Sequence, residues 1–196
     1  MKKLNLAIIG QGRSGRDIHG AYCRSEKNIY YNVKYVIDFD ERRRKQAETL
    51  YPGCTTFSDY RELFKVDDVD LVVNASYSQM HYEIAKDLIE HGKNVLTEKP
   101  FARNTYECEA LIETAKKKGV VLAVFHNTQP APFYLHALKL IKEGVLGDVK
   151  QVSIRYNSLS RRWDWQTLQK YMGGSAYNTG PHPIAMGLGF LDFDEN

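Results

Sequence analysis

Near-continuous apolar runs alternate with segments of helical spacing along the chain up to Val124. The apolar runs predict strands covered on both faces, as in a parallel sheet, at residues 4–9, 33–38, 69–74, 94–98 and 120–125, with a shorter one at 54–57. The intervening segments predict helices over residues 15–25, 41–50, 79–91 and 105–118. Gly92 and Gly119 stand where two of these helices need a left-handed C-terminal cap. This alternation is typical of βαβ units and favours an α/β fold with a parallel sheet.

The pattern changes beyond Val124. The elements predicted there are a helix that follows Pro130 and Pro132 and ends near Glu143, a β-strand over residues 149–157, and a helix after a glycine pair that carries His182. We therefore expect two domains, residues 1–124 and residues 125–196, with the second of α+β type.

The composition disfavours two classes of partner. Of 196 residues, 43% are hydrophobic and 26% are charged, and the formal net charge is only +3. Such a small charge gives no reason to expect nucleic acid or an anionic membrane as a partner, and the basic stretches Arg42–Lys45 and Arg161-Arg162 are short and lie close to acidic residues. No segment approaches the about 20 apolar residues of a membrane span. We expect neither a nucleic-acid nor a membrane partner.

The three cysteines, Cys23, Cys54 and Cys108, are scattered along the chain. They lack the close pairing of zinc sites and disulfide frameworks. Reduced thiols in a cytoplasmic protein without a metal site are the expectation.

A glycine motif follows the first apolar run directly, in the sequence Gly10-Gln11-Gly12-Arg13-Ser14-Gly15. In a dinucleotide fingerprint the first glycine permits a tight turn, the second lets the pyrophosphate approach the backbone, and the third allows close packing of helix on strand. Strand, turn and helix occur in the order that the motif requires. The alternative is a glycine-rich turn with a purely structural role.

Asp38 ends the second predicted strand, close to the offset at which an acid binds the ribose 2′-hydroxyl of NAD. Alternatively, Asp38 or Asp40 only caps the helix that begins near Glu41. The run Arg42–Lys45 raises NADP as the alternative cofactor, because an arginine just beyond this strand can bind the 2′-phosphate. An acid at position 38 would repel that phosphate, so we predict NAD.

Lys99 follows the apolar stretch Asn94–Thr97 in the tripeptide Glu98-Lys99-Pro100. Ligands of open parallel sheets bind at the carboxyl ends of the strands, where an ammonium group can hold a substrate hydroxyl and favour the alkoxide as hydride leaves. His182 is a candidate proton acceptor, because histidine titrates near neutral pH. A solvated surface lysine and a packed loop histidine remain the alternatives, and His81, His126 and His136 carry the same ambiguity.

As a set, these residues resemble the glucose-fructose oxidoreductase, inositol dehydrogenase and MocA (Gfo/Idh/MocA) family. The segments that carry the resemblance are Gly10–Gly15 with His19 downstream, Asn74–Ser78 through His81, His91–Pro100, Lys142–Val149 and Gly173–His182. Of these, the lysine motif and its neighbours are specific, whereas the glycine loop is not.

The resemblance implies a Rossmann doubly wound parallel sheet that binds NAD(P), followed by the beginning of an α+β domain for substrate binding and oligomerisation. It implies an oxidoreductase acting on a secondary hydroxyl of a sugar, polyol or related small molecule, as a homo-oligomer when full-length. Lys99 would be the catalytic lysine, with His182 and Asn178 beside it in the reaction. The residues expected along the cofactor are Gly10, Gly12, Arg13, Ser14, Gly15, Asp38, Ser76, Tyr77, His81, Glu98, Lys99 and Asn127.

The chain departs from the family pattern at two positions. Asn178 stands where the family commonly has aspartate, and Ala185 stands where it often has another acid. Asn178 hydrogen-bonds but carries no charge, so the proton relay would rest on Lys99 and His182. A dinucleotide-sensing regulatory protein on the same fold is therefore the alternative function.

The third departure is length, because members of this family usually continue well past the histidine helix into a large antiparallel sheet. We expect the chain to be a fragment of a longer enzyme, since a single strand at residues 149–157 would leave an unpaired edge. A natural short form and a catalytically empty fragment are the alternatives.

Overall fold

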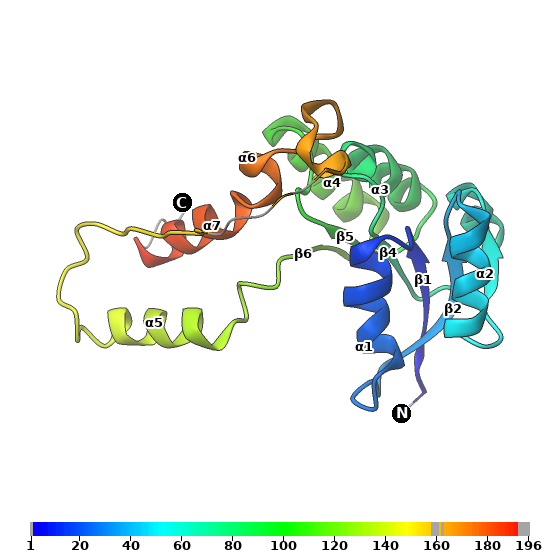
Figure 1. Cartoon of the computed structure of the whole chain (residues 1–196), viewed down its shortest axis with the longest axis horizontal. Helices are drawn as coiled ribbons and strands as arrows, with labels where there is room; N and C mark the ends of the chain where they lie inside the picture. Colours follow the sequence, from blue (N-terminus) through cyan, green and yellow to red (C-terminus); the bar gives the residue numbers. More distant parts are fainter. Residues whose placement is uncertain (1, 158–160, 162, 192–196) are drawn as a thin grey trace. The chain divides into compact units, whose positions relative to one another are not determined.

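The computed structural model describes residues 2–157, 161 and 163–191 (Figure 1). Arg162 of the basic stretch noted above lies outside the described residues. The chain divides after Phe125 into two compact units, which are described separately.

The first unit is a six-stranded parallel sheet in the order β3-β2-β1-β4-β5-β6. Its strands are β1 (Leu4–Ile9), β2 (Tyr31–Ile37), β3 (Thr55–Phe57), β4 (Leu71–Asn74), β5 (Val95–Glu98) and β6 (Leu122–Phe125). The α-helices are α1 (Gly20–Arg24), α2 (Glu41–Leu50), α3 (His81–Glu90) and α4 (Thr105–Lys118), and shorter turns are η1 (Arg13–His19), η2 (Tyr60–Lys65) and η3 (Ser78–Met80). The predicted Rossmann doubly wound sheet is confirmed.

Two apolar cores form because successive side chains of a strand point to opposite faces of the sheet. On β1, Ala7 and Ile9 join the core beneath α3 and α4, which includes Leu88 and Leu111. Leu6 and Ile8 join the core on the other face, with Val36, Ala47 and Tyr51. The central strand is therefore buried on both faces, as its continuous apolar run predicts.

The first helix differs from its prediction over residues 15–25. It begins at Arg13 as the π-helical turn η1 and continues as α1 from Gly20. The Gly20 amide donates to the Gly15 carbonyl, five residues back, which is the hydrogen bond of a π-helix. Elsewhere Asn104 caps α4 at its start, and Gly119 ends it with a φ of +68° as predicted.

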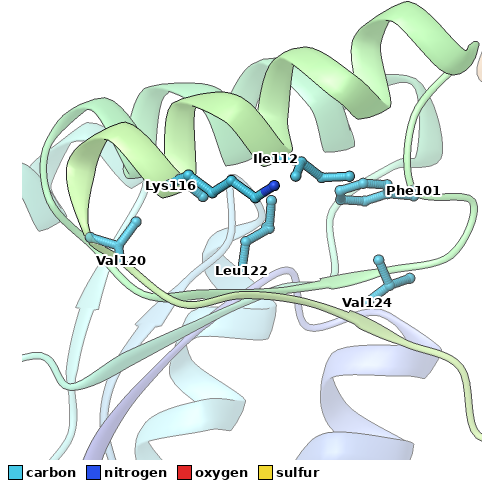
Figure 2. Close-up of a pocket in the computed structure, with 7 residues that line it drawn as sticks. Phe101, Ile112, Lys116, Val120, Leu122 and Val124 are labelled. Atoms are coloured by element: carbon cyan, nitrogen blue, oxygen red, sulfur yellow. The ribbon is translucent and has the colours of Figure 1, made fainter.

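An apolar cavity of about 340 Å³ lies between α4 and the edge of the sheet (Figure 2). Its lining residues are Phe101, Ile112, Ala115, Lys116, Val120, Leu122 and Val124. Lys116 is the charged side chain among them, and the other walls are apolar. Such a lining does not suit a nucleotide, which needs several polar partners.

The second unit is helical in the part that the structure describes. It contains α5 (Pro132–Lys142), α6 (Ser175–Asn178), α7 (Pro181–Phe190) and two short turns, η4 (Trp165–Thr167) and η5 (Gln169–Tyr171). The helix predicted to carry His182 forms as α7, but a separate short helix, α6, precedes it after the glycine pair. Pro181 and Pro183 lack the amide hydrogens needed to continue a helix, but Pro181 suits the first position of a new one.

The β-strand predicted over residues 149–157 is also wrong, because no strand forms there. A strand needs a neighbour to accept and donate its backbone hydrogen bonds, and the described residues of this unit contain no other strand. Tyr156 of this segment instead contacts α7. Tyr156 places its hydroxyl 3.6 Å from Met186 Sδ, and its ring stacks on His182.

Candidate functional site

The carboxyl ends of four neighbouring strands bring the sequence motifs together in the first unit. The glycine loop follows β1, Asp38 follows β2, Ser76 follows β4, and Lys99 follows β5. The strand order reverses between β1 and β4, and open α/β sheets bind ligands outside the strand ends at this point. The fold therefore places the candidate residues where a ligand is expected.

The three glycines have different surroundings. Gly10 has a φ of +88°, and a Cβ there would lie 2.3 Å from the Ala75 carbonyl oxygen. A Cβ on Gly15 would lie 1.8 Å from the Gly10 carbonyl oxygen. A Cβ on Gly12, in contrast, would meet nothing within 4 Å. Gly10 and Gly15 are thus required by packing, whereas Gly12 opens onto free space beside the loop.

This loop fits a dinucleotide pyrophosphate. The open side of Gly12 is the space that a bound phosphate would fill. The neighbouring Gln11 is buried, and its side-chain amide nitrogen and oxygen have no hydrogen-bond partner among the described residues. Buried polar atoms normally have partners, so the loop has unused hydrogen-bonding capacity.

Asp38 is buried at the end of β2 and contacts the glycine loop. Its carboxylate accepts hydrogen bonds from the backbone N–H of Gln11 at 2.7 Å and from that of Asp40 at 2.9 Å. Arg43 Nη1 lies 3.5 Å from the same carboxylate. Asp40, not Asp38, caps α2 by accepting from the Arg42 amide. The alternative of a helix cap thus applies to Asp40.

Glu98 joins the glycine loop to the lysine turn. Its Oε1 accepts hydrogen bonds from Ser14 Oγ and, at 3.0 Å, from His19 Nε2, while the Lys99 amide lies 3.3 Å from Oε2. The carboxyl is buried, which raises its pKa, but the hydrogen bonds from His19 and Ser14 together outweigh burial, and the net pKa is lowered from its ordinary 4.5. Glu98 is therefore an ionised anchor for both loops.

We predict that Glu98 makes the first unit acid-sensitive. A carboxyl whose pKa is lower in the folded chain stabilises the fold above its unfolded pKa, here near 4.5, and the stabilisation is lost as the pH falls through the lower folded value. Glu98→Gln is expected to lower the free energy of unfolding by about 1–3 kcal/mol at neutral pH and to flatten its decline below pH 4.5. Urea unfolding at several pH values measures both effects. Glu113→Gln, at an exposed position of α4, is the control.

His81 joins the loops after β4 and β5. Its Nδ1 donates to the Pro100 carbonyl oxygen at 2.7 Å, and its Nε2 lies 3.3 Å from the Ser76 carbonyl oxygen. The ring is buried, and burial lowers its pKa despite these two carbonyls. The fully buried Asn74 supports the same turn, since it donates to the His81 carbonyl at 3.1 Å and accepts from Ser76 Oγ at 2.7 Å.

The remaining cofactor candidates in this unit differ in exposure. Arg13 is exposed, whereas Ser14, Ser76, Tyr77 and Lys99 are half-buried. The Tyr77 ring lies 6.2 Å from that of Phe39, which follows β2. The peptide bond between Lys99 and Pro100 is cis.

The other three candidates belong to the second unit. His182 lies in the first turn of α7, and its Nδ1 is 3.0 Å from Thr128 Oγ1. Asn178 is half-buried at the end of α6, and its backbone N–H donates to the Gly174 carbonyl at 2.9 Å. Asn127 is exposed.

Several contact residues are not among the sequence candidates: Gln11, His19, Asn74 and Thr128. His19 and Asn74 stand in the motif segments, four residues after Gly15 and two before Ser76, so the motifs contain a signal for them. Nothing in the sequence distinguishes the buried amide of Gln11 or the hydroxyl of Thr128. Among the described residues, no cluster of side chains suits a metal ion, and no helix is long and apolar enough to cross a membrane.

Residues 4–126 match the family described as "Oxidoreductase family, NAD-binding Rossmann fold" (GFO_IDH_MocA). Among curated proteins, scyllo-inositol 2-dehydrogenase (NADP(+)) IolU of Bacillus subtilis (strain 168) is 39% identical over 162 residues, which are 82% of this chain and 48% of that protein. A second enzyme of that name and organism, IolW, is 28% identical over 183 residues, 92% of this chain and 50% of that protein.

Among solved structures, GenD2 from gentamicin A biosynthesis in complex with NAD superposes with a TM-score of 0.83 at 25% identity. The superposition covers 97% of this chain and 54% of that one. The chain spans about half the length of the curated relatives it matches.

Proposed function

Because the chain belongs to the oxidoreductase family with an NAD-binding Rossmann fold, we propose that the protein transfers hydride between a nicotinamide cofactor and a secondary hydroxyl or ketone of a small molecule. Sugars, polyols and related compounds are the proposed substrates, as the names of the inositol dehydrogenase relatives support. The observation that carries the proposal is the Glu98 anchor, which connects a glycine loop to the turn of Lys99.

The chain's own residues would hold the cofactor in three places. The backbone of Gly10–Gly15 would bind the pyrophosphate, Asp38 the ribose of the adenosine half, and Ser76 and Tyr77 the nicotinamide half. His81 would act indirectly, since it is buried and hydrogen-bonded to Pro100. When bound, the oxidised cofactor supplies an acceptor for the hydride that leaves the substrate carbon.

In the oxidation direction, Lys99 would donate a hydrogen bond to the substrate oxygen and favour the alkoxide as hydride leaves. His182 would accept the hydroxyl proton, and the carbon–oxygen bond would become a carbonyl. The role of His182 rests on its sequence motif and on its contacts within the second unit. Asn178 would hydrogen-bond without taking up a proton.

We predict tighter binding of NADH than of NADPH. The acidic side chain of Asp38 suits a ribose 2′-hydroxyl and disfavours a 2′-phosphate, although the relatives IolU and IolW are named for NADP(+). Asp38→Asn is expected to narrow the ratio of the two dissociation constants about tenfold, or 1.4 kcal/mol. Cofactor fluorescence titrations at low salt measure both constants.

Asp40→Asn is the matched control, because asparagine caps helices as well as aspartate does, and its ratio should equal that of the parent. Tighter binding of NADPH by the parent chain would contradict the assignment of Asp38. Binding of neither cofactor would remove the support for the proposed function.

The uncharged Asn178 favours one alternative, a dinucleotide-sensing regulatory protein on the same fold. Assay of the full-length protein against a panel of sugars, polyols and their ketones separates the two functions. Cofactor reduction with any member supports the enzyme, whereas cofactor binding without turnover across the panel supports the sensor.

A further inference from the structure

The Thr128 hydroxyl group contacts one nitrogen atom of each of two imidazole rings in the second unit. Its Oγ1 is 3.2 Å from His126 Nε2 and 3.0 Å from His182 Nδ1. The two rings stack on each other, with centroids 4.9 Å apart and planes 8° apart. Thr128 and His182, 54 positions apart in the sequence, are thus in contact.

A hydroxyl group in this position has to orient its single proton. It donates one hydrogen bond and accepts others, while a neutral imidazole carries one N–H and one acceptor nitrogen. The arrangement that keeps the hydroxyl proton within this group has Thr128 donating to one histidine and accepting from the other. When His182 donates from Nδ1, its Nε2 is the acceptor nitrogen and His126 Nε2 accepts from Thr128; in the reverse orientation both tautomers are exchanged.

The stacked geometry favours a shared proton over two charged rings. Two imidazolium ions at this separation would repel each other, so protonation of one ring disfavours protonation of the other. Tyr156 is another titratable side chain beside His182, with ring centroids 6.5 Å apart. His126 is only half-buried, so it has access to water.

We propose that Thr128 is a positioning residue that fixes the tautomer of His182 and shares a proton between His182 and His126. This inference rests on the proposed function, in which His182 accepts the substrate proton. The accepting atom would be Nε2, because Nδ1 contacts Thr128. As that proton arrives, the Nδ1 proton of His182 passes to Thr128 Oγ1, and the hydroxyl proton of Thr128 passes to His126 Nε2. His126 then carries the positive charge and releases a proton to water.

The test is the ring ¹⁵N spectrum of the histidines in the 196-residue chain and in two variants. Thr128→Val removes the hydroxyl group at nearly constant shape, and Thr128→Ser keeps it. In the parent and in Thr128→Ser, His126 and His182 should each show one predominant tautomer. In Thr128→Val the ring shifts of both should change, while those of His136, exposed on α5, stay unchanged.

Unchanged ring shifts of His182 in Thr128→Val would overturn the proposal. Mixed tautomers in Thr128→Ser, with its backbone spectrum unchanged from the parent, would also overturn the proposal. The serine variant therefore keeps the test valid if the valine variant does not fold. Because this readout needs neither substrate nor turnover, failure of the proposed function would appear separately, as a parent enzyme that reduces no cofactor.

Discussion

Replacement of Lys99 by methionine in the full-length protein is expected to lower kcat by about 10²–10⁴-fold, the usual range for loss of a group that assists proton transfer. Methionine keeps the length of the side chain but has no charge and no hydrogen-bond donor. The alkoxide that develops as hydride leaves would then lose its stabilising partner. Steady-state kinetics with a substrate from the panel measures the effect.

The Lys99 variant also needs a binding measurement, since the same change could disturb the cofactor. The NADH dissociation constant should stay close to that of the parent, because the glycine loop and Asp38 are untouched. Lys116→Met, at an exposed position of α4, is the matched control and should retain full turnover. Unchanged kcat in Lys99→Met would refute the catalytic assignment.

Two alanine substitutions in the glycine loop are expected to have different effects, Gly15→Ala on the stability of the fold and Gly12→Ala on cofactor affinity. Gly15→Ala should lower the free energy of unfolding by at least about 1–3 kcal/mol, the usual cost of overpacking. The reason is a Cβ only 1.8 Å from the backbone oxygen of Gly10, which cannot move aside as a side chain does. Gly12→Ala should leave stability unchanged, because its Cβ meets nothing within 4 Å and its φ of −73° suits alanine.

The same Gly12→Ala variant should have an NADH dissociation constant at least about tenfold higher than the parent, a loss of about 1.4 kcal/mol in binding free energy. The reason is that the methyl group would occupy the space of the pyrophosphate. Urea unfolding and fluorescence titration on the parent and both variants provide the comparison. Parental affinity in Gly12→Ala would mean that the open side of the loop is not the phosphate site. Parental stability in Gly15→Ala would contradict the close approach of Gly15 to the Gly10 carbonyl oxygen.

The sheet was predictable because its cause is local. A strand buried on both faces needs apolar residues throughout, and Leu6–Ile9 supply both cores by simple alternation. The chemistry of glycine and proline likewise predicts the end of α4 at Gly119 and the start of α5 at Pro132. The failed strand at residues 149–157 shows the limit of this reasoning, because alternation describes faces but cannot supply the neighbouring strand that backbone hydrogen bonds require.

By itself, the sequence determined the Rossmann sheet and the strand ends at which Gly10, Asp38, Ser76 and Lys99 gather. Only the tertiary structure decided what these residues contact. It assigned the helix cap to Asp40, made Glu98 the partner of Ser14 and His19, and placed Thr128 between two histidines. Hydrophobic periodicity depends on residues that are close in the sequence. A buried hydrogen bond depends instead on which distant segments come into contact, and this is determined only when the whole unit has packed.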